Sequence, residues 1–345
     1  MRAAWYEHRG GPRETLVLGE MPDPVPGDGE VRIALTVSGV NPGDVKKRAG
    51  WQGSPMPFPR VIPHSDGAGT IDAVGPGVSG DRVGERVWCY GAQSYRPFGT
   101  AADYVVVPDG LAVRLPSPAQ TGGGADLDEQ AACLGIAGIT AHRAVFADGP
   151  VSGLVVLVHG AAGGVGSIAT QLARRDGATV LAVVRTDGQL ARAQAIGAEH
   201  AFRDDDPALA GGIRAVAPDG VDRIADVDFD AHADLNAEVL AVGGVISSYF
   251  SSADRPPVPY WALGFKDATL RLLGSDDFTP AVKAAAARAL TDALVAGSLR
   301  SGIAARFPLE EIASAHELVE SGPPGRVIIY FDREPVTGAV RRGYA

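Results

Sequence analysis

The stretch "VVLVHGAAGGVGS", residues 155–167, decides the fold of this chain. Its β-branched start predicts a strand, and "GVGSIATQLARRDG" (164–177) predicts a helix. Between them lies a turn of glycine and alanine. Such a helix N-terminus offers unpaired N–H groups and a partial positive charge, which suits an anion. The small residues Ala161, Gly163 and Gly166 match the dinucleotide-binding fingerprint, with alanine in the first place.

We assign one role to each small residue of this fingerprint. The first allows the tight turn, the second lets backbone approach a phosphate, and the third lets the helix pack on the strand. We therefore expect the loop to hold a dinucleotide pyrophosphate through Ala161, Ala162, Gly163, Gly164, Val165 and Gly166. A purely structural glycine-rich turn is the alternative.

Strands and helices alternate on both sides of the loop. Apolar runs at 154–159, 179–184, 221–227, 243–250 and 268–274 predict strands of a parallel, doubly wound sheet. The first 120 residues instead contain β-branched runs punctuated by Gly and Pro, which predicts a β-rich region. Residues 129–146 are expected to form one helix, with Asp128 as its cap. The fold class is α/β.

Composition narrows the class of protein. A length of 345 residues suits two domains. A net charge of -10 argues against a nucleic-acid partner or an anionic membrane surface. No run approaches the roughly 20 apolar residues of a membrane span, and the start "MRAAWYEHRG" lacks a signal-peptide pattern. Two cysteines cannot form a disulfide framework or a four-cysteine zinc lobe. We expect a cytoplasmic protein.

The second strand of the alternating region indicates the cofactor. An NAD-preferring site places Asp or Glu about 20 residues after the glycines, on the adenine-ribose hydroxyls. Val184 stands there, followed by Arg185 and Thr186. A guanidinium can bind a 2′-phosphate through paired hydrogen bonds, whereas a carboxylate would repel it. We predict NADPH, with Arg185 as the main 2′-phosphate contact and Thr186 beside it; a solvated surface arginine is the alternative.

At this point the chain resembles a known family nearly end to end. The resemblance is carried in order by "SGVNPGDVKKRAG" (38–50), "VIPHSDGAGTIDAVGPGV" (61–78), "GTAADYVVVP" (99–108), "LGIAGITAHRAVF" (134–146), residues 156–174 and "FPLEEIASAHELVESG" (307–322). It is similar to the medium-chain dehydrogenase/reductase superfamily, and most similar to the zinc-free NADPH:quinone oxidoreductases. The resemblance implies a GroES-like β-rich substrate domain (1–130 and 274–345), a Rossmann domain (131–273), an active site between them, and a homodimer paired through the cofactor domains.

The zinc-dependent relatives provide a test of the sequence. Where they carry ligands, the resemblance places Asp44 for the first Cys, Ser65 for the His and Asp66 for the Glu. We therefore expect no metal. A rival set, Asp44, His64 and Cys133, lies one to three positions from the ligand sites and would suit zinc chemically. Neighbouring residues of a strand point to opposite faces, so a residue one position from a ligand site usually points away from it. We therefore interpret Asp44 as a pocket or cap residue, His64 as a loop residue and Cys133 as a buried apolar group.

Without a metal, hydride transfer to an acceptor that supplies its own electron sink is favoured, namely a quinone or an α,β-unsaturated carbonyl. The resemblance suggests that Asn41 and Thr140 lie near the nicotinamide, with Asp44 beside them; Lys46 stands where several relatives carry Tyr and is either a proton donor or a solvated residue. Ser247, Lys266 and Arg326 are expected to contact cofactor. Tyr249, Tyr260 and Trp261 suit an acceptor wall, a lid or a dimer contact.

Three other functions remain open at this stage. The same fold serves dedicated enal or enoyl-thioester reductases. An intact cradle is also compatible with an NADPH-binding protein that does not catalyse a reaction, such as a sensor. A zinc alcohol dehydrogenase would need the rival ligand set. Nothing in the sequence fixes the acceptor.

Overall fold

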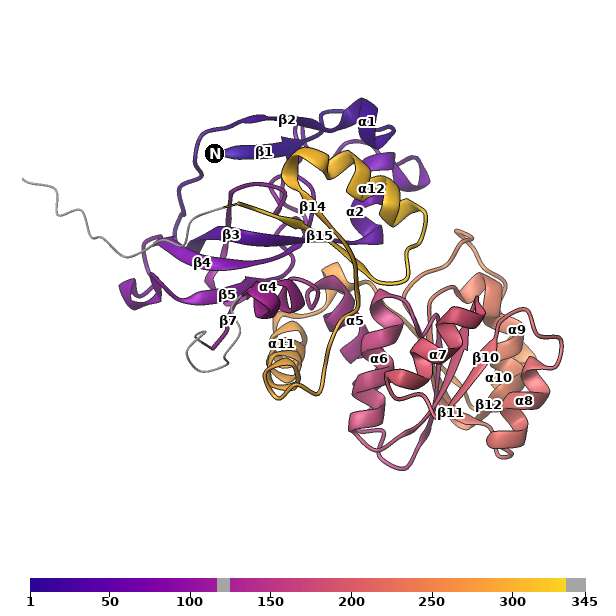
Figure 1. Cartoon of the computed structure of the whole chain (residues 1–345). Coiled ribbons are helices and arrows are strands. Elements are labelled where there is room, and N and C mark those ends of the chain that lie inside the picture. Colours follow the sequence, from indigo (N-terminus) through magenta and orange to yellow (C-terminus); the bar gives the residue numbers. More distant parts are fainter. Residues whose placement is uncertain (117–124, 333–345) are drawn as a thin grey trace, which may run out of the picture.

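The computed structural model describes residues 1–116 and 125–332. Figure 1 shows two bodies: both ends of the chain build the β-rich one at upper left, and the middle of the chain builds the other at lower right. The β-rich body holds a seven-stranded sheet in the order β14-β15-β3-β4-β5-β7, with β6 paired to β3. Its strands are β3 (Glu30–Val40), β4 (Asp66–Val74), β5 (Arg86–Cys89), β6 (Tyr104–Pro108), β7 (Ala112–Arg114), β14 (Ile303–Pro308) and β15 (Arg326–Tyr330).

Shorter elements surround this sheet. A two-stranded sheet pairs β1 (Arg2–Trp5) with β2 (Val17–Glu20). The helices of this body are α1 (Pro12–Thr15), α2 (Pro42–Ala49) and α12 (Ile312–Glu320), with 3-10 turns η1 (Trp51–Gly53), η2 (Gly80–Arg82), η3 (Asp109–Leu111) and η5 (Leu309–Glu311). Alternate residues of β3 and the inner face of α12 fill its core, which includes Ile33, Leu35 and Ile312.

The second body is the predicted doubly wound sheet. Six parallel strands follow the order β10-β9-β8-β11-β12-β13. They are β8 (Val155–His159), β9 (Thr179–Val184), β10 (His200–Arg203), β11 (Val221–Asp226), β12 (Leu240–Ser248) and β13 (Thr269–Leu272). The connecting helices are α6 (Gly164–Arg175), α7 (Asp187–Ala195), α8 (Leu209–Val216), α9 (Phe229–Val239) and α10 (Tyr260–Gly264).

Both faces of this sheet are buried, as strand alternation requires. On β8, Val156 and Val158 face one core, which α5 (Ile136–Phe146), α6 and α11 (Pro280–Val295) cover. Leu157 faces the opposite core, beneath α8 and α9. The α/β fold class with a Rossmann-like parallel sheet is thus confirmed. The domain boundaries at 130 and 274 stay a prediction.

The predicted helix over 129–146 is wrong. The chain forms α4 (Ala125–Ala131), breaks, and restarts as α5 at Ile136. Asp128 lies within α4 instead of capping it; its carboxylate accepts from Arg86 Nε at 2.6 Å and from Thr36 Oγ1 at 3.0 Å. The break has a physical cause at Gly135, where an added Cβ would lie 2.0 Å from Asp66 Oδ1. The Asp66 carboxylate also accepts the N–H of Ile136 at 2.9 Å, a donor that a continuous helix would bond to the carbonyl of Ala132, so a new helix starts there.

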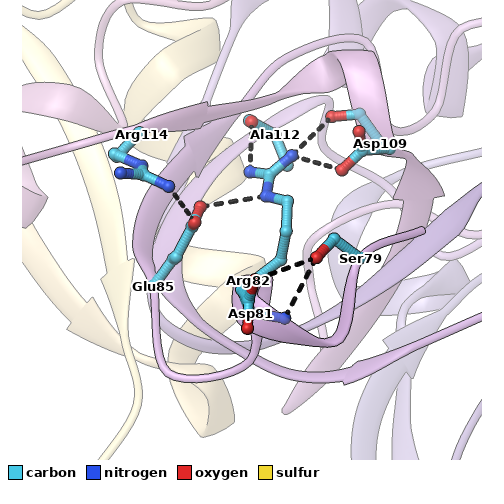
Figure 2. Close-up of polar contacts among 7 residues, drawn as sticks. All are labelled: Ser79, Asp81, Arg82, Glu85, Asp109, Ala112 and Arg114. Carbon is cyan, nitrogen blue, oxygen red and sulfur yellow. Dashed lines mark hydrogen bonds and ion pairs between the residues drawn. The ribbon is translucent and has the colours of Figure 1, made fainter.

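An arginine network fixes the outer end of the β-rich body, away from the second body. Figure 2 shows Arg82 of η2 donating to Glu85, Asp109 and the backbone of Ala112. The Nη2–O distance to Ala112 is 2.9 Å, and Arg114 contacts the same Glu85. Because one guanidinium satisfies three loop segments at once, it holds the short strand β7 against β5.

Candidate active site

The glycine loop leaves the carboxyl end of β8 in a tight turn. Gly160 has a φ of 63°, which favours glycine, and Gly163 N–H donates to its carbonyl at 2.8 Å. The left-handed turn residue is therefore Gly160 and not Ala161, which is fully buried in the core instead. An added Cβ on Gly166 would lie 2.2 Å from Gly160 O, so the third small residue does allow α6 to pack against the strand.

Arg326 lies over this loop. An added Cβ on Gly164 would meet Arg326 Nη1 at 3.3 Å, although Arg326 starts β15 in the other body. The side chain is 4% exposed, and its Nε and Nη2 atoms have no hydrogen-bond partner within the described ranges. Its nearest acid is Asp66, 3.8 Å from Nη2. Nη1 is therefore the atom nearest the start of α6, and a buried guanidinium beside a helix N-terminus fits a bound pyrophosphate.

Arg185 stands free at the end of the neighbouring strand. β9 pairs with β8, and Arg185 follows directly after Val184. Its backbone N–H donates to Gln189 Oε1 at 3.0 Å, whereas its guanidinium is exposed and has no partner among residues 1–116 and 125–332. Thr186 is the N-cap residue of α7, and its side chain makes no capping bond. The arrangement leaves a free cation where an acid would select NAD.

Ser247 and Lys266 lie at different edges of the sheet. Ser247 is fully buried near the carboxyl end of β12, and its Oγ lacks a partner in the described chain. Lys266 lies in the connection between β12 and β13, and its contact with the cofactor stays a prediction. Its Nζ donates to Glu238 O at 2.9 Å and Leu240 O at 2.6 Å, where β12 begins. The connection through α10 returns the chain to the amino edge before β13, far from the glycine loop.

Asp66, which has no predicted role in catalysis or binding, joins the two bodies. It accepts from Asn41 Nδ2 at 2.8 Å and from the first N–H of α5, at Ile136, at 2.9 Å. Burial raises its pKa from 3.8 to about 6, while Arg326 and Asn41 oppose the rise. The available signal was its place in "PHSDGAG", where zinc relatives carry Glu. It was missed because its partners lie far away in the sequence.

Asp44 and Asn41 complete this cluster. Asp44 Oδ2 accepts from the backbone N–H of Asn41 at 2.8 Å, so it caps α2. Burial, followed by repulsion from Asp66, raises the pKa of Asp44 from 3.8 to about 7. Asn41 Nδ2 donates one of its two N–H groups to Asp66, so donation of the other to substrate stays a prediction; its Oδ1 is buried without a partner in the described residues. The cluster therefore presents a carbonyl oxygen and a protonatable carboxyl pair.

Thr140 and Lys46 take different positions. The Thr140 hydroxyl is buried and donates to Ile136 O at 2.6 Å, within its own helix α5. Lys46 extends from α2 to the second body, where its Nζ lies 3.2 Å from the centroid of the Phe250 ring. Tyr260 and Trp261 are exposed on α10, just before Lys266, and do not wall this region. Phe250, which no sequence pattern indicated, lies there instead.

A directed chain of hydrogen bonds supports Asp66 from behind. Arg48 Nε donates to His316 Nδ1 at 3.3 Å, so His316 Nε2 donates to His64 Nε2 at 2.9 Å. His64 Nδ1 then donates to Ser38 Oγ at 2.9 Å. The chain continues from Ser38 to Thr100 Oγ1 and on to Asp66 O, each at 2.7 Å.

This series of hydrogen bonds explains the unusual backbone conformation of His64. His64 has a φ of 75°, a left-handed conformation that is rare outside glycine. Both of its ring nitrogens are bonded, which holds the residue in that conformation. Burial lowers the pKa of His64 to about 3, so the ring is neutral, as the hydrogen-bond pattern requires.

A second buried network stands directly behind the glycine loop. His159, the last residue of β8, stacks on His232 of α9 with ring centroids 4.0 Å apart. His159 Nε2 donates to Asn236 Oδ1 at 2.8 Å, and Asn236 and His232 both donate to Asp226 at the end of β11. The network ties the ends of β8 and β11 together, which gives the loop a rigid base.

The rival zinc set does not assemble. Cys133 is buried within an apolar core. Both ring nitrogens of His64 are already hydrogen-bonded, to Ser38 and to His316. In the ranges that the structure describes, no three His, Cys, Asp or Glu side chains gather as a metal ion would need. The same part of the chain contains no helix that is long and apolar enough to cross a membrane.

Comparisons with known proteins agree with this geometry. The family model described as "Alcohol dehydrogenase GroES-like domain" matches residues 27–117, and the one described as "Zinc-binding dehydrogenase" matches residues 164–286. Together they define a two-part dehydrogenase of the medium-chain superfamily. Human quinone oxidoreductase is 30% identical over 95% of this chain and 97% of its own length. The chain belongs to the quinone oxidoreductase family of the medium-chain dehydrogenase/reductase superfamily.

Two further comparisons bear on chemistry. A 2-haloacrylate reductase from a Burkholderia species is 30% identical over 91% of this chain and 94% of its own length. A mycobacterial protein whose structure was solved in complex with NADPH is 29% identical, with a TM-score of 0.82 over 96% of this chain and all of the other.

Proposed function

We propose that this protein is an NADPH-dependent reductase that transfers hydride to a quinone or an α,β-unsaturated carbonyl. The observation that carries the proposal is the glycine loop, with the unsatisfied Arg326 guanidinium above it and the free Arg185 guanidinium beside it. NADPH binding in a similar protein and the quinone oxidoreductase relatives support the same reading. When bound, the cofactor supplies a hydride from its nicotinamide.

The chain's own residues bind, orient and handle protons. Gly163 and Gly164 leave space for phosphate at the start of α6, and Arg326 neutralises its charge. Arg185 holds the 2′-phosphate. Ser247 Oγ, buried without a partner in the described chain, is free to bond a cofactor group.

The carboxyl pair handles the proton. Because burial and repulsion from Asp66 raise its pKa to about 7, Asp44 exchanges a proton near neutral pH and is the proton donor of the proposed reaction. A reduced quinone or enolate oxygen needs such a proton. Thr140 and Lys46 remain candidates for contact with the nicotinamide and the acceptor.

Steady-state assays test the reaction. NADPH oxidation is followed at 340 nm with 9,10-phenanthrenequinone and with trans-2-hexenal, each with and without EDTA. We expect quinone turnover that survives EDTA. Turnover of the enal alone would favour a dedicated enal reductase, which the 2-haloacrylate reductase relative supports. NADPH binding without turnover of either acceptor would favour a non-catalytic binding protein.

The cofactor preference has its own test at Arg185. Arg185→Ala should raise KM for NADPH about tenfold or more, because a charge-assisted hydrogen bond contributes about 1.5–3 kcal/mol. KM for NADH should stay within about twofold. Arg175→Ala removes an exposed arginine from the far end of the neighbouring helix α6 and serves as the control. An unchanged NADPH preference would remove Arg185 from the site.

We propose a homodimer in the cytoplasm. The parallel sheet ends in β13, which among the described strands pairs only with β12. In the connection that leads to β13, Tyr260, Trp261 and Phe265 are 70%, 69% and 81% exposed; Trp261 stacks on Phe265, and Tyr260 meets it edge to face. An exposed aromatic cluster next to an open sheet edge supports pairing through the cofactor domains. Both cysteines, Cys89 and Cys133, are free, which suits a reducing compartment.

A further inference from the structure

Lys46 is the one member of a cationic triplet on α2 that lacks an acidic partner in the described chain. The next residue, Lys47, pairs with Asp276 at 3.0 Å, and Arg48 pairs with Glu320. Lys46 instead contacts two aromatic rings. Its Nζ lies 3.2 Å from the centroid of Phe250 and 5.8 Å from that of Trp51.

These three side chains meet across the gap between the two bodies. Trp51 follows α2 in the β-rich body, whereas Phe250 follows β12 at the carboxyl edge of the parallel sheet. Phe250 is held there by its carbonyl, which accepts from Phe229 N–H at 3.0 Å. The two rings are 6.4 Å apart and inclined at 39°. Ser247 and the glycine loop lie at the same edge, so the group faces the candidate site.

The surroundings of Lys46 favour an anion. Burial lowers its pKa, because the ammonium has lost water without gaining a counter-ion; Asp228 opposes this only from a distance. The Asp228 carboxylate already accepts from Ser252 N–H at 2.7 Å. A cation–π contact with a ring stabilises an ammonium by about 0.5–2 kcal/mol, which is less than the stabilisation by a paired anion in a half-buried site.

We propose that Lys46, Trp51 and Phe250 form a subsite for the anionic substituent of a planar acceptor, a carboxylate or a sulfonate. This rests on the proposed function and deepens it, since it names negatively charged quinones or conjugated acids as the acceptor class. The Trp51 ring covers the flat apolar part of the acceptor, and the ammonium, held on the face of Phe250, pairs with its charge. Trp51 is 47% exposed, which leaves its ring accessible.

The proposal differs from a proton-donor role for Lys46 in a measurable way. Loss of a proton donor lowers kcat for every acceptor. Loss of an anion anchor raises KM for charged acceptors only. The kinetic test therefore compares 1,2-naphthoquinone with 1,2-naphthoquinone-4-sulfonate in the wild type, Lys46→Met and Lys46→Arg.

We expect Lys46→Met to raise KM for the sulfonate about tenfold while KM for the neutral quinone stays within about twofold. Lys46→Arg keeps the charge and should retain most of the wild-type KM. Arg175→Gln removes one positive charge from the far end of α6 and should change neither KM. Equal effects of Lys46→Met on both quinones would overturn the anion subsite.

A binding assay separates this proposal from the proposed function. Calorimetry with NADP⁺-saturated protein compares 2-naphthoate with 2-naphthamide, which have the same shape and differ in charge. The wild type should bind the carboxylate more tightly, and Lys46→Met should lose that difference. If the wild type turns over neither the quinones nor trans-2-hexenal, the proposed function fails, yet the calorimetry still decides the subsite. Equal affinities of wild type and Lys46→Met for 2-naphthoate would overturn it.

Discussion

At the scale of single residues, the site depends on two carboxyl groups that share one asparagine. Asp66 holds the Asn41 side chain and Asp44 holds its backbone N–H, so each acid fixes a different part of the same residue. Both acids have raised pKa values, to about 6 and about 7, because both are buried. Both groups therefore exchange protons close to neutral pH, and this makes stability depend on pH.

Asp44→Asn tests this pH dependence. A pKa raised from 3.8 to about 7 means that the folded state binds the Asp44 proton more tightly than the unfolded state. Its contribution to stability is complete below about pH 4 and is lost as the pH rises through about 7. Asparagine cannot ionise, yet its oxygen can still accept from Asn41 N–H. Between about pH 5 and pH 8, the free energy of unfolding of the variant should therefore rise relative to that of wild type by on the order of 2 kcal/mol.

Urea unfolding at several pH values measures this gain. Asp219→Asn changes an exposed aspartate and is the matched control, with an expected pH dependence equal to that of wild type. A constant difference between Asp44→Asn and wild type across the pH range would show that Asp44 ionises normally in the folded protein.

The sequence predicted the local parts of the site but not the long-range ones. The glycine loop was predictable because its small residues are consecutive and each meets a neighbour within the same strand–turn–helix unit. Asp66 was not, because it contacts Asn41 and Ile136 from 25 and 70 residues away. The position of Lys266 at the amino edge of the sheet was not predictable either, because the short helix α10 inside the connection turns the chain there.

At the scale of elements, the packing of α6 on β8 depends on one missing methyl group. Gly166→Ala would place Cβ 2.2 Å from Gly160 O, and backbone on both sides leaves little room to move. We expect a loss of at least 2 kcal/mol in stability and weaker NADPH binding, because the helix start must move away from the loop. Thermal unfolding and NADPH fluorescence titration measure the two effects.

Gly211→Ala supplies the matched control. Gly211 lies within α8, and an added Cβ there meets nothing within 4 Å. The change should stabilise the protein by about 0.5–1 kcal/mol, as alanine normally does in a helix. Equal Tm values for Gly166→Ala and wild type would contradict the close packing of α6.

Periodicity alone predicted the parallel sheet, since each strand is a short apolar run between helical patterns. It failed at α4 and α5, where the apolar pattern continues through the break. The helix stops because the Asp66 carboxylate occupies the space beside Gly135 and then caps Ile136. No local pattern encodes a cap that arrives from another strand.

At the scale of the whole molecule, buried histidines connect distant parts of the chain. His64 and His316 join the start of β4 to α12, and burial lowers both pKa values. For His64, with a pKa of about 3 against an ordinary 6.5, the unfolded chain binds the proton more tightly. This contribution to stability is complete above about pH 6.5 and is lost as the pH falls towards 3.

His64→Gly isolates this effect, because glycine adopts a φ of 75° without strain. The wild type should be the more stable protein near pH 8, through its buried hydrogen bonds. Its advantage should shrink by on the order of 2 kcal/mol by about pH 4.5, as the unfolded wild type gains protons. Chemical unfolding at each pH gives the difference; an advantage that grows on acidification would contradict a neutral, buried His64.

The exposed edge of the parallel sheet gives the last prediction. If two copies pair along β13, Trp261→Lys and Phe265→Glu place charges in an apolar interface and should convert a dimer to a monomer. Val25→Glu is the matched control, since Val25 is 84% exposed in the β-rich body, away from β13. Sedimentation velocity should show wild type and Val25→Glu at twice the mass of the 35.5 kDa chain. A wild type that sediments as a monomer at all concentrations would leave the aromatic cluster without this role, while NADPH turnover in the monomeric variants would show that each chain holds a complete active site.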